Sequence, residues 1–243
     1  MPSKLTINYS PNFSTYTRNS KEIKFVIFHY TGMNSEKRAI KKLTDYNSKV
    51  STHYFIKRNG EIILMVPETY IAWHAGKSKW KNYNLLNSTS IGIEISNKGH
   101  QHGYQNYSVK QIHSLINLSK RLIKKYNIKN NSILGHSDVA YNRKKDPGEK
   151  FPWQLLSKKK IGIWHNLNKN TLSKIRNISI NNIEKNTLYK CLRKIGYNFN
   201  YLSLNQTRKL LIAFQRRFRP EVINGKFDKE CLIIAKKLSK LGN

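Results

Sequence analysis

The chain has 243 residues, enough for one medium-sized domain and a small one. Its 45 lysine and arginine residues against 13 acidic residues give a formal net charge of +32 at pH 7, spread over the whole chain. Such a charge attracts nucleic acid, an anionic wall polymer or a membrane surface equally well, so it singles out no partner. No apolar run approaches the length of a membrane span. The two cysteines, Cys191 and Cys231, are too few for a zinc knuckle and suit a reducing compartment, with a disulfide between them left open.

The first part of the chain predicts a strand followed by a helix. Residues 1–22 are polar, and we expect an irregular segment without the apolar core of a secretory signal peptide. The continuous β-branched and aromatic run Lys24–His29 predicts a buried strand that ends on an imidazole. Ser35 is placed to cap a helix over Glu36–Tyr46, in which the apolar residues keep helical spacing.

The next part predicts a hairpin and a further strand. Two short apolar runs, Thr52–Lys57 and Glu61–Val66, flank Asn59-Gly60, and Asn-Gly is a strong hairpin signal. Alternation in Ser90–Ser96 predicts a strand with three isoleucines on one face and Glu94 on the other.

The remaining elements define the expected fold class. A long amphipathic helix should run from Ser108 to about Tyr126. Strands that alternate with helices predict an α/β domain over residues 23–157, with a mixed central sheet flanked by helices. Residues 158–181 are basic and Asn-rich and predict a linker or irregular crossover. Residues 182–243 predict a small C-terminal three-helix domain, whose size is marginal for folding alone.

The segment Leu134–Gly148 carries the strongest chemical signal. It holds an imidazole, His136, and a carboxylate, Asp146, at the ends of one short loop, which Asp-Pro-Gly closes and in which we expect no helix. With His29 as the best candidate for a third ligand, the set offers two nitrogens and one oxygen. A fourth tetrahedral position is left for water, which is the ligand count of a catalytic zinc site.

A metal hydrolase also needs a base for the water and a cation for the developing oxyanion. Glu94, a single acid among isoleucines, suits the base, and Lys144, two residues before Asp146, suits the cation. Plainer interpretations stay open: His29 as a hydrogen-bonded residue at a strand end, Glu94 as an ion-pair partner, and Lys144 as solvated charge.

Several motifs in chain order carry a resemblance to a known family. They are Phe28-His-Tyr-Thr31, Ser51-Thr-His-Tyr-Phe-Ile-Lys-Arg-Asn-Gly60, Ala72-Trp-His-Ala-Gly76, Asn87-Ser-Thr-Ser-Ile-Gly-Ile-Glu-Ile95 and Gly135-His-Ser-Asp-Val-Ala…Lys144-Lys-Asp-Pro-Gly148. Over about residues 20–157 the chain resembles the zinc-dependent N-acetylmuramoyl-L-alanine amidases of the AmpD/AmiD (type 2 amidase) family. The resemblance implies one Zn²⁺ per chain, held by His29, His136 and Asp146. It also implies that Glu94 and Lys144 are the catalytic residues.

His53, Trp73 and His74 match family motif positions, and the resemblance places them at the substrate groove, with packing in the core as the open alternative. Tyr30 lies next to the expected ligand His29 and is a further candidate for substrate contact. The C-terminal pattern from Leu192 to Asp228 resembles the three-helix peptidoglycan-binding domain that AmiD-type enzymes append. That architecture is typical of the cell envelope, whereas the N-terminus without a visible signal favours the cytoplasm, so the location stays open.

The resulting hypothesis is hydrolysis of the amide bond between N-acetylmuramic acid, or its anhydro form, and L-alanine of the peptidoglycan stem peptide. Peptidoglycan or muropeptides are the expected partners, and nucleic acid would bind only through non-specific charge. A wall-binding protein that keeps zinc without turnover is the first rival, and a nucleic-acid binder is the second. The oligomeric state and the preference between intact wall and anhydro-muropeptides stay open.

Overall fold

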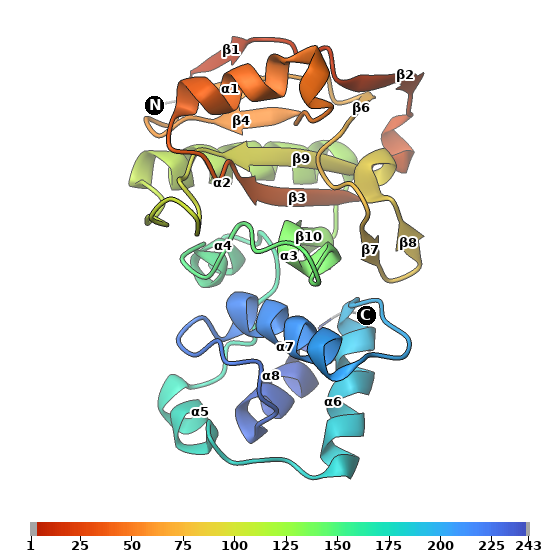
Figure 1. The fold of residues 1–243 in the computed structure, drawn as a ribbon, viewed down its shortest axis with the longest axis vertical. Coiled ribbons are helices and arrows are strands. Elements are labelled where there is room, and N and C mark those ends of the chain that lie inside the picture. The colour runs from red at the N-terminus through yellow and green to blue at the C-terminus, as the bar shows by residue number, and fades with distance from the viewer. Residues whose placement is uncertain (1–3, 242–243) are drawn as a thin grey trace.

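The structure, a computed structural model, describes residues 4–241, so residues 1–3 and 242–243 of the predicted terminal segments lie outside it. Its centre is a six-stranded mixed sheet in the order β1-β5-β4-β9-β3-β10 (Figure 1). The strands are β1 (Leu5–Ile7), β3 (Phe25–Tyr30), β4 (Tyr54–Ile56), β5 (Ile62–Leu64), β9 (Ser90–Ile95) and β10 (Ile133–Gly135). The α/β architecture with a mixed central sheet, predicted from the sequence, is confirmed.

The centre of the sheet is parallel, and this positions the candidate site. β3 lies between β9 and β10 and runs parallel to both. Parallel strands end at the same edge of a sheet, where α/β proteins place their ligands. His29, Glu94 and the residue that follows Gly135 therefore meet at one edge. The predicted hairpin is also present, because β4 and β5 pair antiparallel across the Asn59-Gly60 turn.

Two helices cover opposite faces of the sheet (Figure 1). α1 (Glu36–Thr44) packs its apolar side on Phe55 and Ile63, and α2 (Val109–Tyr126) belongs to the larger cluster on the other face, which contains Tyr54 and Ile56. Neighbouring residues of β4 therefore point to opposite faces of the sheet and contribute to the clusters on both. The predicted caps are present, since the side chains of Ser35 and Ser108 accept hydrogen bonds from the backbone of the first turns. α1 ends two residues before the predicted Tyr46, because Asp45 adopts an extended backbone and caps the next turn.

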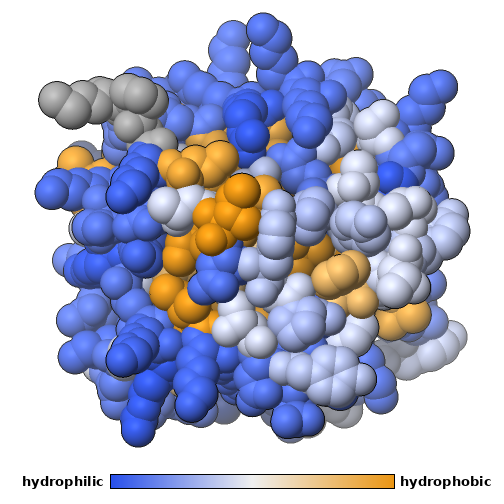
Figure 2. Space-filling view, turned by 90° about the horizontal axis from the view of Figure 1, so that it is seen from above, coloured by the Kyte–Doolittle hydropathy of each residue, from blue (hydrophilic) through white to orange (hydrophobic). Residues whose placement is uncertain are grey.

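The N-terminal segment is not irregular, which corrects the expectation for residues 4–22. β1 pairs in parallel with β5, and β2 (Phe13–Thr17) pairs antiparallel with β6 (Tyr70–Ala72). Leu5 and Ile7 are exposed, so β1 is held by backbone hydrogen bonds at a sheet edge rather than by burial of its apolar side chains. Figure 2, which views this end of the molecule, shows hydrophobic side chains gathered in the middle of a largely hydrophilic face.

The ligand loop also differs from expectation, because it begins with one helical turn, α3 (His136–Val139). Pro147 and Gly148, which disfavour a helix, act only at the far end of the loop. At its start the Asp138 carboxylate accepts a hydrogen bond from the Gly135 backbone N–H at 2.7 Å, and this bond caps the turn.

The C-terminal part is helical and packs directly on the α/β part. Its helices are α4 (Trp153–Lys158), α5 (Lys169–Ile175), α6 (Asn182–Ile195), α7 (Leu204–Phe218) and α8 (Lys229–Ser239). The predicted linker contains the buried Ile161 and the short helix α5, whose first turn is capped by Asn168. It is therefore not irregular throughout. The weak periodicity hid this helix, because Leu172 is its only buried residue.

One hydrophobic cluster joins the two parts, since it contains Phe28 and Trp153 together with Phe214 and Phe218 of α7. The helices therefore do not form a separate core, although the boundaries of the predicted domains remain a prediction. The remaining strand pair is β7 (Lys79–Trp80) with β8 (Tyr83–Asn84). Cys191 and Cys231 are both free. None of the helices within residues 4–241 has the length and apolar character needed to cross a membrane.

Candidate metal centre and active site

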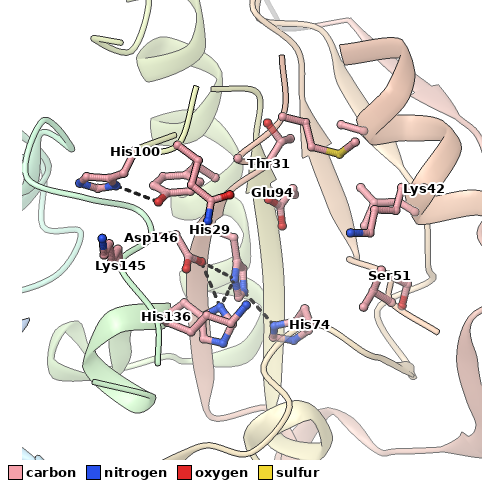
Figure 3. A pocket seen from close by; sticks show the side chains of 18 of the residues that line it. His29, Thr31, Lys42, Ser51, His74, Glu94, His100, His136, Lys145 and Asp146 are labelled. Atoms are coloured by element: carbon pink, nitrogen blue, oxygen red, sulfur yellow. Dashed lines mark hydrogen bonds and ion pairs between the residues drawn. The ribbon is translucent and has the colours of Figure 1, made fainter. Parts of the chain in front are cut away.

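Three ligand-type side chains converge at the carboxyl ends of β3 and β10 (Figure 3). His29 is the next-to-last residue of β3, His136 begins α3, and Asp146 lies in the loop that follows. His29 Nδ1 lies 2.9 Å from His136 Nδ1 and 3.1 Å from Asp146 Oδ2, and the last two atoms lie 3.0 Å apart. All three residues are buried. The structure thus brings together the three residues that the sequence predicts as zinc ligands.

A chain of hydrogen bonds indicates which nitrogen of His29 carries its proton. The Ser90 hydroxyl donates to the Leu86 carbonyl oxygen at 2.6 Å, so the Ser90 oxygen accepts from His74 Nε2 at 3.2 Å. His74 Nδ1 is then an acceptor and takes the hydrogen bond of His29 Nε2 at 3.0 Å. His29 Nδ1 is left with a lone pair that faces the centre of the cluster.

His136 is oriented by a backbone carbonyl. Its Nε2 lies 3.1 Å from the carbonyl oxygen of Ala75, which can only accept, so Nε2 carries the proton and Nδ1 presents a lone pair to the cluster. Arg143 donates to the same carbonyl oxygen at 2.5 Å and to that of Lys77 at 2.7 Å, which holds this segment in place. Two imidazole lone pairs and a carboxylate oxygen therefore point at one centre. A cation at that centre would offset their mutual repulsion, and this donor set suits zinc.

The ionisation states of the cluster also suit a metal. Burial, reinforced by the adjacent His136, lowers the pKa of His29 to about 4, so His29 is neutral at pH 7. Burial alone would raise the pKa of Asp146, but the adjacent imidazoles of His136 and His29 outweigh it and hold the pKa well below its usual range. Neutral imidazole and ionised carboxylate are the forms that bind metal.

Glu94 lies beside this cluster. It is the register partner of His29 across the parallel strands β3 and β9, so the two side chains project from the same face of the sheet. Its carboxylate reaches into the cavity over the cluster (Figure 3). Burial, followed by the charge of Asp146, raises the pKa of Glu94 to about 8. A carboxyl group with a pKa near neutrality is able to accept a proton and to return it.

The cavity has a volume of about 380 Å³ and contains most of the residues predicted to act on substrate. Tyr30, Trp73 and His74 line it, and His74 also orients His29 as described above. Lys144 lines it as well. Its charge adds to the lowering of the His29 pKa and offsets a small part of the rise in the Glu94 pKa that burial causes. The cation predicted from sequence thus lies close to the cluster.

The lining of the cavity is partly apolar, because it includes Met33, Leu43 and Val50. Lys42 of α1 also lines the cavity, and Figure 3 shows it across from the metal cluster. The cavity therefore combines apolar surface with several cationic side chains, which suits a ligand that carries carboxylates and has aliphatic parts.

His53 does not line this cavity, and the structure places it in the core, the alternative that the sequence left open. It is fully buried, its Nδ1 accepts a hydrogen bond from the Gly92 N–H at 3.0 Å, and its Nε2 lies 3.1 Å from the Tyr70 carbonyl oxygen. Gly92 has a second role, because a Cβ there would lie 2.4 Å from Cγ of His74. Only glycine lets His74 reach His29.

Sequence reasoning missed several residues that support the site. Ser90 and Arg143 orient the ligand histidines through the contacts above, and Ala75 acts through its carbonyl oxygen, so its side chain carries no signal. His100 joins the Tyr30 hydroxyl (2.8 Å) to the Glu149 carboxylate (2.9 Å) in the cavity wall. Ser90 lies within one of the family motifs, but a serine there gives no indication of this role, and His100 lies outside the motifs.

Residues 19–149, more than half of the chain, match the family described as N-acetylmuramoyl-L-alanine amidase. The chain belongs to this family. The matched range includes His29, Glu94, His136 and Asp146, so the residues of the cavity lie on the part of the chain that defines the amidases. The resemblance stated from the motifs is confirmed.

Individual amidases resemble the chain over nearly its whole length. It is 35% identical to the N-acetylmuramoyl-L-alanine amidase AmiD of Escherichia coli over 229 residues, which are 89% of this chain and 82% of that protein. The structure of E. coli AmiD in complex with anhydro-N-acetylmuramic acid-L-Ala-D-γ-Glu-L-Lys aligns with a TM-score of 0.80 at 31% identity and covers 94% of this chain and 93% of the other. AMPDH3 from Pseudomonas aeruginosa, in complex with an anhydromuramic pentapeptide, gives 0.80 at 31% identity, with coverage of 95% and 96%.

Proposed function

We propose that the protein hydrolyses the amide bond between N-acetylmuramic acid, or its anhydro form, and L-alanine of the peptidoglycan stem peptide, in a reaction that depends on zinc. One observation carries this proposal: two imidazole lone pairs and one carboxylate oxygen face a common centre, and Glu94 stands beside it at the cavity. The structure of the similar amidase AmiD carries anhydro-N-acetylmuramic acid-L-Ala-D-γ-Glu-L-Lys, which contains this type of bond, and that of AMPDH3 carries an anhydromuramic pentapeptide.

The proposed metal ligands are His29 Nδ1, His136 Nδ1 and Asp146 Oδ2. A zinc ion held there supplies a Lewis acid, which polarises a carbonyl group and makes water a better nucleophile at neutral pH. The ligand side chains are already desolvated, and the pKa shifts of His29 and Asp146 favour the neutral imidazole and the ionised carboxylate, so little reorganisation is needed on binding.

Glu94 and Lys144 are the proposed catalytic residues. Glu94 accepts a proton from the attacking water and returns it to the leaving amine, a role that its raised pKa supports. Lys144 places a positive charge at the cavity wall, where it stabilises the oxyanion of the tetrahedral intermediate. Tyr30 and Trp73 are proposed to contact the substrate from the walls of the cavity.

We also propose that residues 182–243 bind peptidoglycan. Their three helices, α6, α7 and α8, correspond to the three-helix pattern expected from the sequence. A second contact with the polymer would raise the effective concentration of bonds at the cavity, and the net charge of +32 would strengthen attraction to an anionic wall.

The test is incubation of the purified protein with anhydro-N-acetylmuramic acid-L-Ala-D-γ-Glu-L-Lys, with and without a chelator, followed by mass spectrometry. We expect release of a peptide that begins at L-alanine, loss of that release with chelator, and recovery on addition of Zn²⁺. Glu94→Gln should bind Zn²⁺ and lose about 10²- to 10⁴-fold in turnover. A wild-type protein that binds Zn²⁺ and cleaves nothing would favour the wall-binding alternative. Cleavage at another peptide bond would refute the bond assignment.

A further inference from the structure

A buried carboxylate, Asp138, joins the metal-binding loop to the C-terminal helices. It lies two residues after the proposed ligand His136, and only 1% of its surface is exposed. Oδ2 accepts a hydrogen bond from the Gly135 N–H at 2.7 Å, so Asp138 closes the turn that carries the ligand. Two side chains from the C-terminal region reach the same carboxylate: the Tyr197 hydroxyl donates to Oδ1 at 2.9 Å, and the Arg217 guanidinium donates to Oδ2.

Arg217 of α7 holds both sides of the ligand. Besides the bond to Asp138, its Nη2 donates to the carbonyl oxygen of Ile133 at 2.9 Å, three residues before His136. The guanidinium lies 4.1 Å from the centre of the Trp153 ring, and the arginine is 3% exposed. One fully desolvated arginine from the C-terminal helices therefore bridges the strand that enters the metal site and the helical turn that leaves it.

A second contact of the same region docks on Trp80 and Lys81, five and six positions after Ala75, the other partner of His136. The Lys81 N–H donates to the Gly196 carbonyl oxygen at 2.7 Å, and the Asn198 side chain donates to the Lys81 carbonyl oxygen at 2.6 Å. Gly196 packs so closely on Trp80 that a Cβ there would lie 2.3 Å from the indole. This docking holds the chain just beyond Ala75, whose carbonyl oxygen orients His136.

From these contacts we propose that Arg217 and Tyr197 are positioning residues for the metal ligand His136. The C-terminal helices are then part of the metal site, in addition to any role in binding the wall. Groups that orient ligands without touching the metal typically change metal affinity about 10- to 100-fold. Removal of the guanidinium would leave the Asp138 charge buried without its cation, and the turn that carries His136 would have to rearrange to solvate it. The inference rests on metal binding by His29, His136 and Asp146, as proposed above.

The chain offers a matched control two residues along. Arg219 is 1% exposed and pairs with the Asp228 and Glu230 carboxylates at the start of α8, within the helical region and without a contact to the metal loop. Arg217→Met and Arg219→Met each remove one buried guanidinium from the same part of the fold. A merely structural role predicts similar behaviour for the two variants.

The experiment uses the full chain. Zn²⁺ affinity is measured by competition with a chromophoric chelator, the visible spectrum of the Co²⁺-loaded protein reports the ligand geometry, and thermal unfolding without metal reports stability. We expect Arg217→Met to weaken Zn²⁺ binding by at least about 10-fold and to alter the Co²⁺ spectrum. Arg219→Met should lose thermal stability and keep the affinity and spectrum of the wild type. Tyr197→Phe keeps the ring and removes only the hydroxyl bond, so it should fold and bind Zn²⁺ more weakly than the wild type.

Wild-type affinity and spectrum in both Arg217→Met and Tyr197→Phe would overturn the inference, and so would equal weakening by Arg217→Met and Arg219→Met. If Arg217→Met does not fold, Tyr197→Phe decides alone, and wild-type affinity in that variant overturns it. Absence of Zn²⁺ binding by the wild-type protein would instead refute the proposed metal site, on which this inference rests.

Discussion

The buried acid Glu94 should destabilise the metal-free protein at neutral pH. Burial raises its pKa from 4.5 to about 8, so the folded state binds a proton that the unfolded state has released at pH 7. Each unit of pKa difference corresponds to about 1.4 kcal/mol in the free energy of unfolding. Between pH 4.5 and pH 7, the buried acid therefore lowers this free energy by about 3 kcal/mol. This is an upper bound, because Glu94 is partly open to the cavity.

The sign follows from which state holds the proton. Below pH 4.5, Glu94 is protonated in both the folded and the unfolded state and does not change the stability. The loss of stability grows as the pH rises from 4.5 to about 8. Glu94→Gln is neutral at every pH and has nearly the same shape. We expect the variant to be more stable than the wild type in chelator, by up to about 3 kcal/mol at pH 7 and up to about 4 kcal/mol at pH 8, and equally stable near pH 4.

The assay is urea unfolding in chelator at several pH values from 4 to 8. Glu221→Gln is the control, since Glu221 is largely exposed and its ion pair with Lys169 should contribute little. Equal stability of wild type and Glu94→Gln at pH 8 would refute the reasoning that burial disfavours the Glu94 carboxylate. Saturating Zn²⁺ should reduce the difference, because a nearby cation favours the ionised form.

Three further changes test the support of the site. His74→Ala removes the acceptor for His29 Nε2 and should weaken Zn²⁺ binding about 10- to 100-fold in a chelator competition; unchanged affinity would contradict the assigned orientation of His29. Gly92→Ala places a Cβ against the His74 ring and should cost about 1–3 kcal/mol in urea unfolding and also weaken Zn²⁺ binding, whereas full retention of both would mean that the ring moves freely. Phe214→Ala empties part of the shared cluster and should cost about 3–5 kcal/mol in one cooperative transition; two separate transitions would indicate that the helices fold independently.

The sequence alone was sufficient for the strands and helices with a strong local pattern. The run that ends on His29 and the helix from Ser108 have apolar periodicity and caps within a few residues, so local chemistry determines them. The Asn59-Gly60 turn is equally local. The sequence also predicted the three candidate ligands, because His136 and Asp146 lie on one short loop and His29 lies at a strand end that parallel topology brings to the same edge.

Tertiary structure decided the features that depend on distant partners. β1 forms because β5 offers an edge to pair with, although the apolar side chains of Leu5 and Ile7 stay exposed. The proton positions on His29 and His136 depend on Ser90 and on a backbone carbonyl, which no side-chain motif records.

The joining of the two parts of the chain is decided in the same way. The sequence shows separate patterns for the α/β part and for the C-terminal helices, because hydrophobic periodicity reports only that each helix has an apolar face. Packing between residues about 80 positions apart decides which surface that face meets. The same packing brings Arg217 to the loop of His136. A buried charge is stable only with its partner, and that partner is supplied by the tertiary fold.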